Sequence, residues 1–173
     1  MTRRNRIILV LLTILLCVSS DQITKEIARS HLPKTKTFSL AADTLRLDYV
    51  ENRGAILSFE CCLPEEWRGP VLTVAVAAFT GSLVLCLLFA SVLRPLTVVA
   101  LSMFCGGSLS NLLDRIALGG DVVDFLSLGW GGFRTAIFNV ADAAIAVGTM
   151  LFVFSLVWHL RLSPSQKASR PIL

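Results

Sequence analysis

Long apolar stretches dominate the chain and predict its architecture. Four of them stand out, at about 7–27, 70–93, 95–113 and 135–160. A helix that crosses a bilayer needs about 20 mostly apolar residues. The second and fourth stretches reach this length easily, while the first and third reach it only by including polar residues near one end. The pattern therefore predicts an all-α membrane protein with four transmembrane helices, in a single domain over residues 1–173.

The first apolar stretch also has two features of a cleavable signal peptide. Arg3, Arg4 and Arg6 precede the apolar run IILVLLTILL, as a basic n-region precedes an h-region. However, no small-x-small cleavage site follows, and Cys17 comes after two leucines. We therefore expect a retained helix.

The segment at about 31–67 follows a different pattern. It contains FSLAADTLRLDYV, in which polar and apolar residues alternate as they do in a half-buried strand. Leu45, Leu47 and Tyr49 are expected on one face, with the two charged residues between them on the other. The alternation predicts a small extracytoplasmic β-rich element between the first two helices, resting on the membrane surface.

A second segment outside the helices, at about 115–134, is rich in glycine and contains one strand candidate, VVDFLSL. Irregular backbone at membrane depth persists only where protein buries it or where it lines a wet cavity. We expect the two segments to form such a cavity together.

Composition and charge agree with a membrane location. Hydrophobic residues make up 54% of the chain and charged residues 16%, and the mean hydropathy is +0.72; soluble domains carry about 25% charged residues. With both termini and the short turn near 94 on one side, that side holds seven positive residues and no acid. These are Arg3, Arg4, Arg6, Arg94, Arg161, Lys167 and Arg170.

The positive-inside rule then predicts that both termini are cytoplasmic. The net charge of +4 is a topology signal, and it gives no reason to expect nucleic-acid binding.

The five cysteines do not predict a metal centre. Three lie in apolar helices, where cysteine is usually a small packing residue. Cys61 and Cys62 are adjacent, and adjacent cysteines rarely form a disulfide with each other. The metal-binding spacing C-x-x-C does not occur.

Ionisable and amide residues gather at the outer ends of the predicted helices and in the loop between the last two. Ionisable residues inside membrane segments are costly and commonly mark a functional site. With alternating helix directions, all of them fall at the same membrane face. The set comprises Asp21, Lys25, Asn111, Asp114, Arg115, Asp124, Asn139 and Asp142.

Purely structural explanations exist for several of these residues. Asp21 and Lys25 have the i, i+4 spacing of an ordinary helix-end ion pair. Arg115 has the position of a side chain that snorkels from a helix end. Asn139 is suited to cap the start of a helix.

Asp124 and Asp142 are harder to explain in this way, because apolar residues flank both. Two carboxylates close together in a low-dielectric site cannot both ionise, so one keeps a proton. Such a pair activates water with one carboxylate and polarises a carbonyl with the other. His31 and His159 fall on opposite sides of the membrane, which excludes their joining one nucleophilic site. The sequence thus favours the chemistry of an aspartic protease.

Two other classes of protein place polar residues in membrane helices. An ion-coupled transporter is expected to show broken helices or an inverted repeat around the bilayer midplane, whereas here the polar residues cluster at one interface. A scaffold subunit needs no acid pair.

Five motifs in order resemble those of the lipoprotein signal peptidases (signal peptidase II). They are DQITK, ENRGAILSF, GGSLSNLLDR, VVDF and FNVADAAI, and together they cover most of the chain. Ile56 and Leu57 depart from the family, which more often has Ala-Phe there.

The resemblance implies a catalytic pair, Asp124 and Asp142, with no metal or other cofactor. It also implies a bacterial inner-membrane location, sensitivity to globomycin, and a prolipoprotein substrate cut before its diacylglyceryl-modified cysteine. The supporting and substrate-binding residues that it implies are Asp21, Lys25, Asn52, Gly54, Asn111, Asp114, Arg115 and Asn139.

Overall fold

Four long helices form the body of the protein in the computed structural model, which describes residues 1–52, 65–90 and 93–161. Each is long and apolar enough to cross a bilayer, so the predicted four-helix architecture is confirmed. The bilayer core offers no hydrogen-bond partners to backbone N–H and C=O groups, and a helix pairs these groups within itself. The helices are α1 (Arg3–His31), α2 (Glu65–Phe89), α3 (Pro95–Ala117) and α4 (Val140–Arg161).

The observed helix ends differ from the predicted ones in three informative places. Helix α1 extends beyond 7–27 at both ends, and α3 continues through Arg115 to Ala117. Arg115 is therefore helical and does not belong to the following loop. Helix α4 starts at Val140, five residues later than predicted, because Phe138 pairs with Leu126 in a β-bridge.

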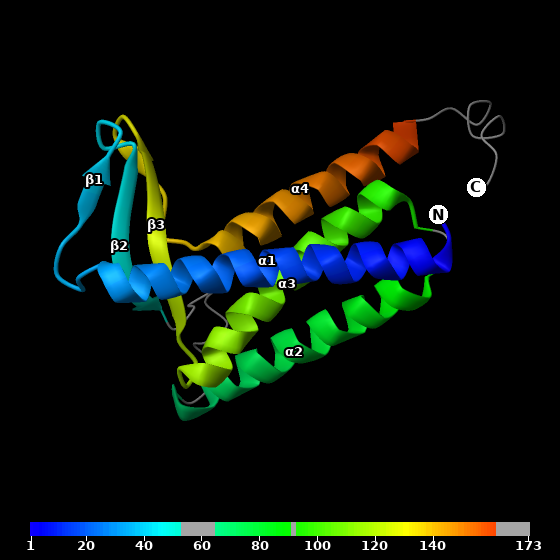
Figure 1. The fold of residues 1–173 in the computed structure, drawn as a ribbon, viewed down its shortest axis with the longest axis horizontal. Helices are drawn as coiled ribbons and strands as arrows, with labels where there is room; N and C mark the ends of the chain where they lie inside the picture. The colour runs from blue at the N-terminus through cyan, green and yellow to red at the C-terminus, as the bar shows by residue number, and fades with distance from the viewer. Residues whose placement is uncertain (53–64, 91–92, 162–173) are drawn as a thin grey trace.

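Helix α3 is the central helix of the bundle. Within its apolar window, 56% of the residues are buried inside the protein, compared with 11% in α1 and in α2. Glycines allow its neighbours to approach closely: a Cβ on Gly106 would lie 2.7 Å from the Cys17 side chain, and one on Gly107 would overlap the carbonyl oxygen of Ala141. The other three helices therefore present most of their surface outward (Figure 1).

A four-stranded antiparallel sheet covers one end of the bundle. The segment predicted to be β-rich, at about 31–67, supplies β1 and β2. The glycine-rich segment at about 115–134 supplies β3 and β4, and β3 confirms the strand predicted there. Strand β2 joins the two halves by pairing with β3. The strands are β1 (Phe38–Leu40), β2 (Leu45–Asn52), β3 (Val122–Trp130) and β4 (Phe133–Arg134).

The predicted alternation along β2 is wrong at Tyr49. Leu47 pairs with Leu126 and Val50 with Asp124, so β2 has one more residue than β3 between these pairs. This β-bulge reverses the alternation. Tyr49 consequently packs in the core on the opposite face from Leu47, beside Val123.

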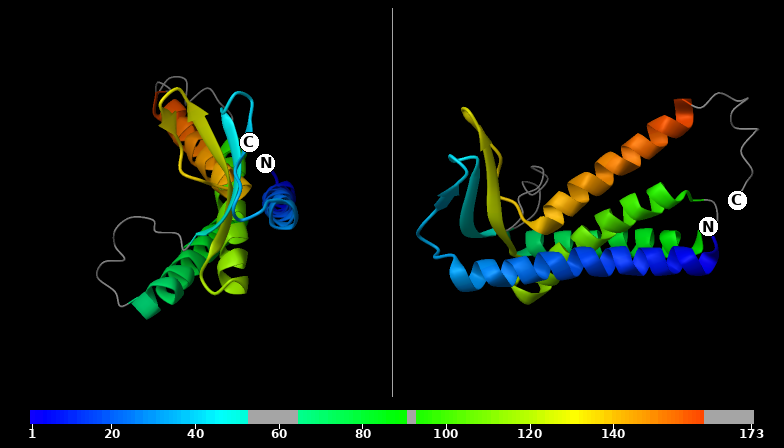
Figure 2. Two further views of the ribbon diagram at one scale, coloured as in Figure 1. Left: turned by 90° about the vertical axis from the view of Figure 1, so that its left-hand side faces the viewer. Right: turned by 45° about the horizontal axis from the view of Figure 1, so that its top comes forward.

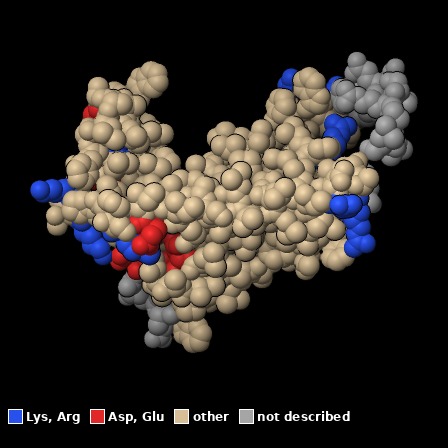
Figure 3. Space-filling view, in the orientation of Figure 1, with Lys and Arg blue, Asp and Glu red and all other residues tan. Residues whose placement is uncertain are grey.

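The sheet and the chain's N-terminus lie at opposite ends of the long axis (Figure 1 and Figure 2). On the face that Figure 3 shows, charged side chains gather at these two ends, and the surface between them is almost free of charge. The polar residues predicted to converge do meet at the sheet end of the helices.

Candidate active site

Asp124 and Asp142 line one cavity of about 360 Å³ between the sheet and the helices. Strand β3 supplies Asp124, and the first turn of α4 supplies Asp142. The structure therefore brings together the two acids that the sequence pairs. The cavity is lined by Asn52, Val76, Phe104, Ser108, Asn111, Arg115, Val122, Asp124, Ile137, Asp142 and Ile145.

Asp124 is only 4% exposed and has two amide partners. Its Oδ1 accepts a hydrogen bond of 2.7 Å from Asn139 Nδ2, and its Oδ2 accepts one of 3.0 Å from Asn52 Nδ2. Burial raises the pKa of Asp124 to about 6, and the negative charge of Asp142 adds to this rise, while the two amide bonds oppose it. Asp124 thus keeps a proton to higher pH than an exposed aspartate does.

Asp142 has surroundings that suit a negative charge. Its Oδ1 accepts from Asn111 Nδ2 at 2.8 Å, and its Oδ2 accepts from the backbone N–H of Asn139 at 3.1 Å. It also lies in the first turn of α4, where the helix dipole favours an anion. The two acids therefore occupy distinct environments.

Asn139 connects the two acids. Its Oδ1 accepts from the backbone N–H of Asp142 at 2.8 Å, and together with the Asp142 bond to its own N–H this forms a reciprocal capping box. Its Nδ2 donates to Asp124. The interpretation of Asn139 as a helix cap is correct, and the same side chain also positions the second acid.

A buried ion cluster lies directly behind the pair. Lys25 Nζ contacts Asp21 Oδ2 at 2.6 Å, Asp114 Oδ2 at 2.8 Å and Asn111 Oδ1 at 2.9 Å. The side chains of all three charged residues are at most 4% exposed. The i, i+4 pair of Asp21 and Lys25 exists, but it is part of a cluster that joins α1 to α3.

The acids of this cluster also hold the backbone of the site. Asp21 Oδ1 accepts from Ala141 N–H at 2.7 Å, near the start of α4. Asp114 Oδ2 accepts from Val123 N–H at 3.1 Å, one residue before Asp124. Asp21 and Asp114 do not line the cavity, and they act by positioning the segments that carry the pair.

Arg115 is 7% exposed and lines the cavity with both acids. Within the described part of the chain, its buried Nε has no hydrogen-bond partner. This side chain therefore does not snorkel to water, and it offers a donor beside the cavity.

Two residues of the site were not singled out from the sequence. Gln22 Nε2 donates to Asp114 Oδ1 at 2.9 Å and to Ser110 Oγ at 3.0 Å, and Ser110 Oγ donates to Asp21 Oδ2 at 2.7 Å. Gln22 lies inside DQITK and Ser110 lies inside GGSLSNLLDR. Their positions within these motifs were the signal by which the sequence could have identified them as site residues. Gly54, which the resemblance implies, lies outside the described residues.

Among the described residues, no group of three His, Cys, Asp or Glu side chains is placed to hold an ion. The oxygens of the cavity acids instead face amide and backbone N–H groups.

Comparison with known proteins agrees with this geometry. A family model described as signal peptidase (SPase) II matches residues 13–158. The lipoprotein signal peptidase of Syntrophus aciditrophicus (strain SB) is 30% identical over 89% of this chain and 95% of that protein. The lipoprotein signal peptidase of Nitratidesulfovibrio vulgaris (strain DP4) is 34% identical over 86% of this chain and 87% of that protein.

Two solved structures, each of a bacterial membrane enzyme, have a similar fold. One has a TM-score of 0.72 at 25% identity and covers 88% of this chain and 89% of its own. The other has a TM-score of 0.69 at 26% identity and covers 86% and 92%. Given the family match over most of the chain and relatives of this similarity, the chain belongs to the signal peptidase II family.

Proposed function

We propose that this chain is an aspartic endopeptidase of the bacterial membrane that removes the signal peptide from prolipoproteins. The single observation that carries this proposal is the pair of Asp124 and Asp142 in one cavity, both held by Asn139. The cavity is also lined by apolar side chains of the spanning helices, such as Phe104 and Ile145. A substrate anchored in lipid reaches such a site without leaving the bilayer.

The different surroundings of the two acids assign their roles. Asp142, at the start of α4, takes a proton from water, and the resulting hydroxyl oxygen bonds to the scissile carbonyl carbon. Asp124, whose pKa is raised to about 6 by burial, gives its proton to the carbonyl oxygen. When the intermediate collapses, one of its hydroxyl groups returns a proton to Asp124, the proton held by Asp142 passes to the leaving nitrogen, and the C–N bond breaks to give the carboxylic acid and the free amine.

Other residues of the cavity are suited to hold the substrate. The buried guanidinium of Arg115 is placed to donate to a substrate carbonyl, and Asn52 fixes the orientation of Asp124. The residues Asp21, Lys25, Asn111, Asp114 and Asn139 position the pair.

The proposal also specifies the bond that is cut in the substrate and the orientation of the chain in the membrane. The scissile bond precedes the diacylglyceryl-modified cysteine of the substrate, and globomycin competes for the same cavity. Both termini face the cytoplasm and the sheet faces outward. This orientation is supported by the basic residues at the end away from the sheet (Figure 3).

The test uses the purified full chain in lipid nanodiscs with a lipidated prolipoprotein, and mass spectrometry detects the released peptide. Asp124→Asn and Asp142→Asn should each lower turnover by at least about 1000-fold, and the double variant should lose little more, because the pair acts as one unit. Glu26→Gln is the matched control, since this exposed acid on α1 lies outside the site.

The control should keep full turnover. Near-normal cleavage by a well-inserted Asp124→Asn or Asp142→Asn protein contradicts the assigned mechanism. Equal cleavage of the unlipidated prolipoprotein contradicts the assigned substrate.

A further inference from the structure

The sheet has one apolar and one polar face at the end away from the acid pair. Residues that pair across antiparallel strands point to the same side. Leu40 pairs with Leu45, which pairs with Leu128, and Trp130 pairs with Phe133. In the four strands, all exposed large hydrophobic side chains lie on this one face: Phe38, Leu40, Val50, Leu128, Trp130 and Phe133.

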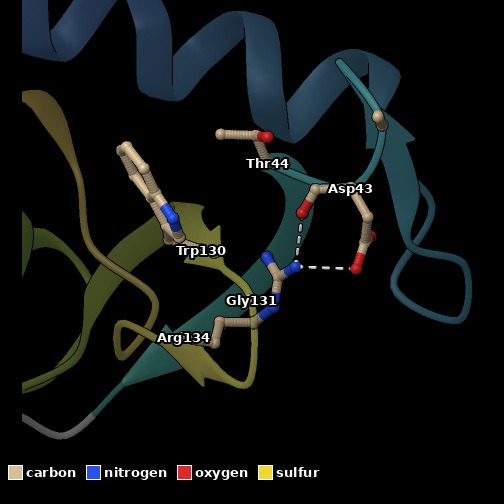
Figure 4. Close-up of a pocket in the computed structure, with 7 residues that line it drawn as sticks. Asp43, Thr44, Trp130, Gly131 and Arg134 are labelled. Atoms are coloured by element: carbon tan, nitrogen blue, oxygen red, sulfur yellow. Dashed lines mark hydrogen bonds and ion pairs between the residues drawn. The ribbon is translucent and has the colours of Figure 1, made fainter.

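At this end of the sheet, the other face of the strands is polar. Ser39 pairs with Arg46, which pairs with Ser127. Arg134 Nη2 donates to the carbonyl oxygen of Asp43 at 2.6 Å and to its Oδ2 at 2.9 Å, which ties the β1–β2 turn to β4 (Figure 4). Asp43 and Arg134, together with Trp130, line a second cavity of about 460 Å³ at this tip of the sheet (Figure 4). The two turns are thus braced together on the polar side.

Near the acid pair both faces of the sheet contact helices: Tyr49 and Val123 pack with Ala28 of α1, and the apolar face lines the active-site cavity. Val122 and Asp124 belong to the apolar face, and they line the active-site cavity together with Val76, Phe104 and Ile145 of three different helices. The sheet runs across the end of the bundle, and its far end extends past the start of α4 (Figure 1 and Figure 2). Beyond α4, the apolar face therefore has no protein beneath it among the described residues.

The space beneath this overhang continues the lipid-facing surface of the protein. Helix α4 exposes large apolar side chains along its length, including Val147, Met150 and Phe154. On the face shown in Figure 3, the surface between the sheet and the opposite end is almost free of charge. Trp130 is 88% exposed and Phe133 72% exposed, although aromatic residues in contact with water are disfavoured and tryptophan prefers the membrane interface.

We infer that the tip of the sheet is a membrane anchor. The side chains of Leu40, Leu128, Trp130 and Phe133 enter the leaflet at the sheet end of the bilayer, while Arg134 and Asp43 stay in water. The indole of Trp130 lies among the headgroups with its N–H hydrogen-bonded there. This contact holds the sheet flat on the bilayer and fixes Asp124 at the depth of the interface.

Depth-dependent fluorescence quenching tests the anchor. The full chain with Trp67→Phe and Trp158→Phe keeps Trp130 as its only tryptophan. It is placed in nanodiscs of phosphatidylethanolamine and phosphatidylglycerol whose acyl chains carry bromine either near the headgroup or near the terminal methyl. Trp130 emission should fall most with the shallow bromines and should respond weakly to aqueous iodide.

The matched control moves the tryptophan to the polar face, with Ser39→Trp in a chain that also carries Trp130→Phe. Its emission should be quenched by iodide and not by brominated lipid. Both proteins should still release signal peptide, which verifies their fold.

Three outcomes overturn the inference. Equal iodide quenching at the two positions places Trp130 in water. Protection from both quenchers places it against a second copy of the chain. Iodide quenching that disappears only when lipidated substrate is added places the substrate's acyl chains on this face.

Discussion

Asn139 holds both acids through different atoms. Its side-chain carbonyl oxygen and backbone N–H form the capping box with Asp142, which leaves its Nδ2 free to donate to Asp124. Capping fixes the side-chain torsions of an asparagine. The hydrogen bonds that stabilise the start of α4 therefore also fix the position of Asp124 relative to Asp142.

Asn111 depends on a neighbour in the same way. Its Oδ1 accepts from Lys25 Nζ and from Asn139 Nδ2. An amide has one acceptor end and one donor end, so these bonds turn Nδ2 toward Asp142. Lys25 therefore determines which end of the Asn111 amide faces Asp142.

The raised pKa of Asp124 predicts the pH dependence of cleavage. Below about pH 6 Asp124 holds the proton that it must donate, and above this value it loses the proton. We expect kcat/KM to fall as pH rises through this region, with an apparent pKa that belongs to the coupled pair. Initial rates measured across the acid-to-neutral range give the profile.

The residual activity of Asp124→Asn provides the control for this profile. It should lack the falling limb, because asparagine does not titrate. A wild-type profile that is flat through this range contradicts a protonated Asp124 as the acid.

At the level of secondary-structure elements, the ion cluster connects three helices and one strand. Lys25 of α1 reaches Asp114 of α3, Asp21 accepts from the start of α4, and Asp114 accepts from Val123 of β3. Removing one member of a buried ion pair leaves an uncompensated charge, which is far more costly than breaking an exposed pair.

Lys25→Met should therefore lower the free energy of unfolding by about 3–5 kcal/mol. It should also lower turnover, because Asn111 loses the partner that orients it. Lys34→Met is the matched control, since Lys34 forms an exposed pair with Glu51, and it should change neither quantity noticeably. Thermal unfolding in detergent and cleavage assays measure the two effects. Unchanged unfolding of Lys25→Met indicates that the cluster does not stabilise the fold.

Close helix contact at Gly107 offers a second test at this scale. A methyl group there meets the backbone carbonyl oxygen of Ala141, which the start of α4 holds in place. Gly107→Ala should destabilise the protein by about 1–3 kcal/mol through overpacking and should reduce cleavage by displacing α4. Gly81→Ala in α2 meets nothing within 4 Å and should leave the unfolding temperature unchanged or higher, because alanine favours a helix.

At the scale of the whole molecule, the distribution of charge and the position of the sheet both support the proposed placement of the helices across the membrane. The body is apolar between two charged ends, and the sheet occupies one of these ends (Figure 1 and Figure 3). The acid pair lies where the helices meet the sheet.

Reporter fusions test the proposed orientation. A fusion after Leu93 or after Arg161 should report a cytoplasmic location, because seven positive residues and no acids lie on that side. A fusion near Asp43, in the β1–β2 turn, should report an extracytoplasmic location. An extracytoplasmic signal at Arg161 contradicts the orientation.

The sequence alone determined the four spanning helices and the identity of the acid pair. Lipid as solvent imposes a length and an apolar composition on each helix, and both are local properties that a single stretch displays. Asp124 and Asp142 were identifiable because an acid among apolar residues has a cost that only a function or a partner explains.

Only the tertiary structure decided how these parts meet. The bulge that turns Tyr49 away from Leu47 follows from the pairing of β2 with a strand about 70 residues later in the chain. Likewise, the i, i+4 spacing of Asp21 and Lys25 predicts a surface pair, whereas packing of α1 against α3 buries it and adds Asp114 and Asn111. Such contacts join residues distant in sequence, so their geometry depends on how whole elements pack and no local pattern records it.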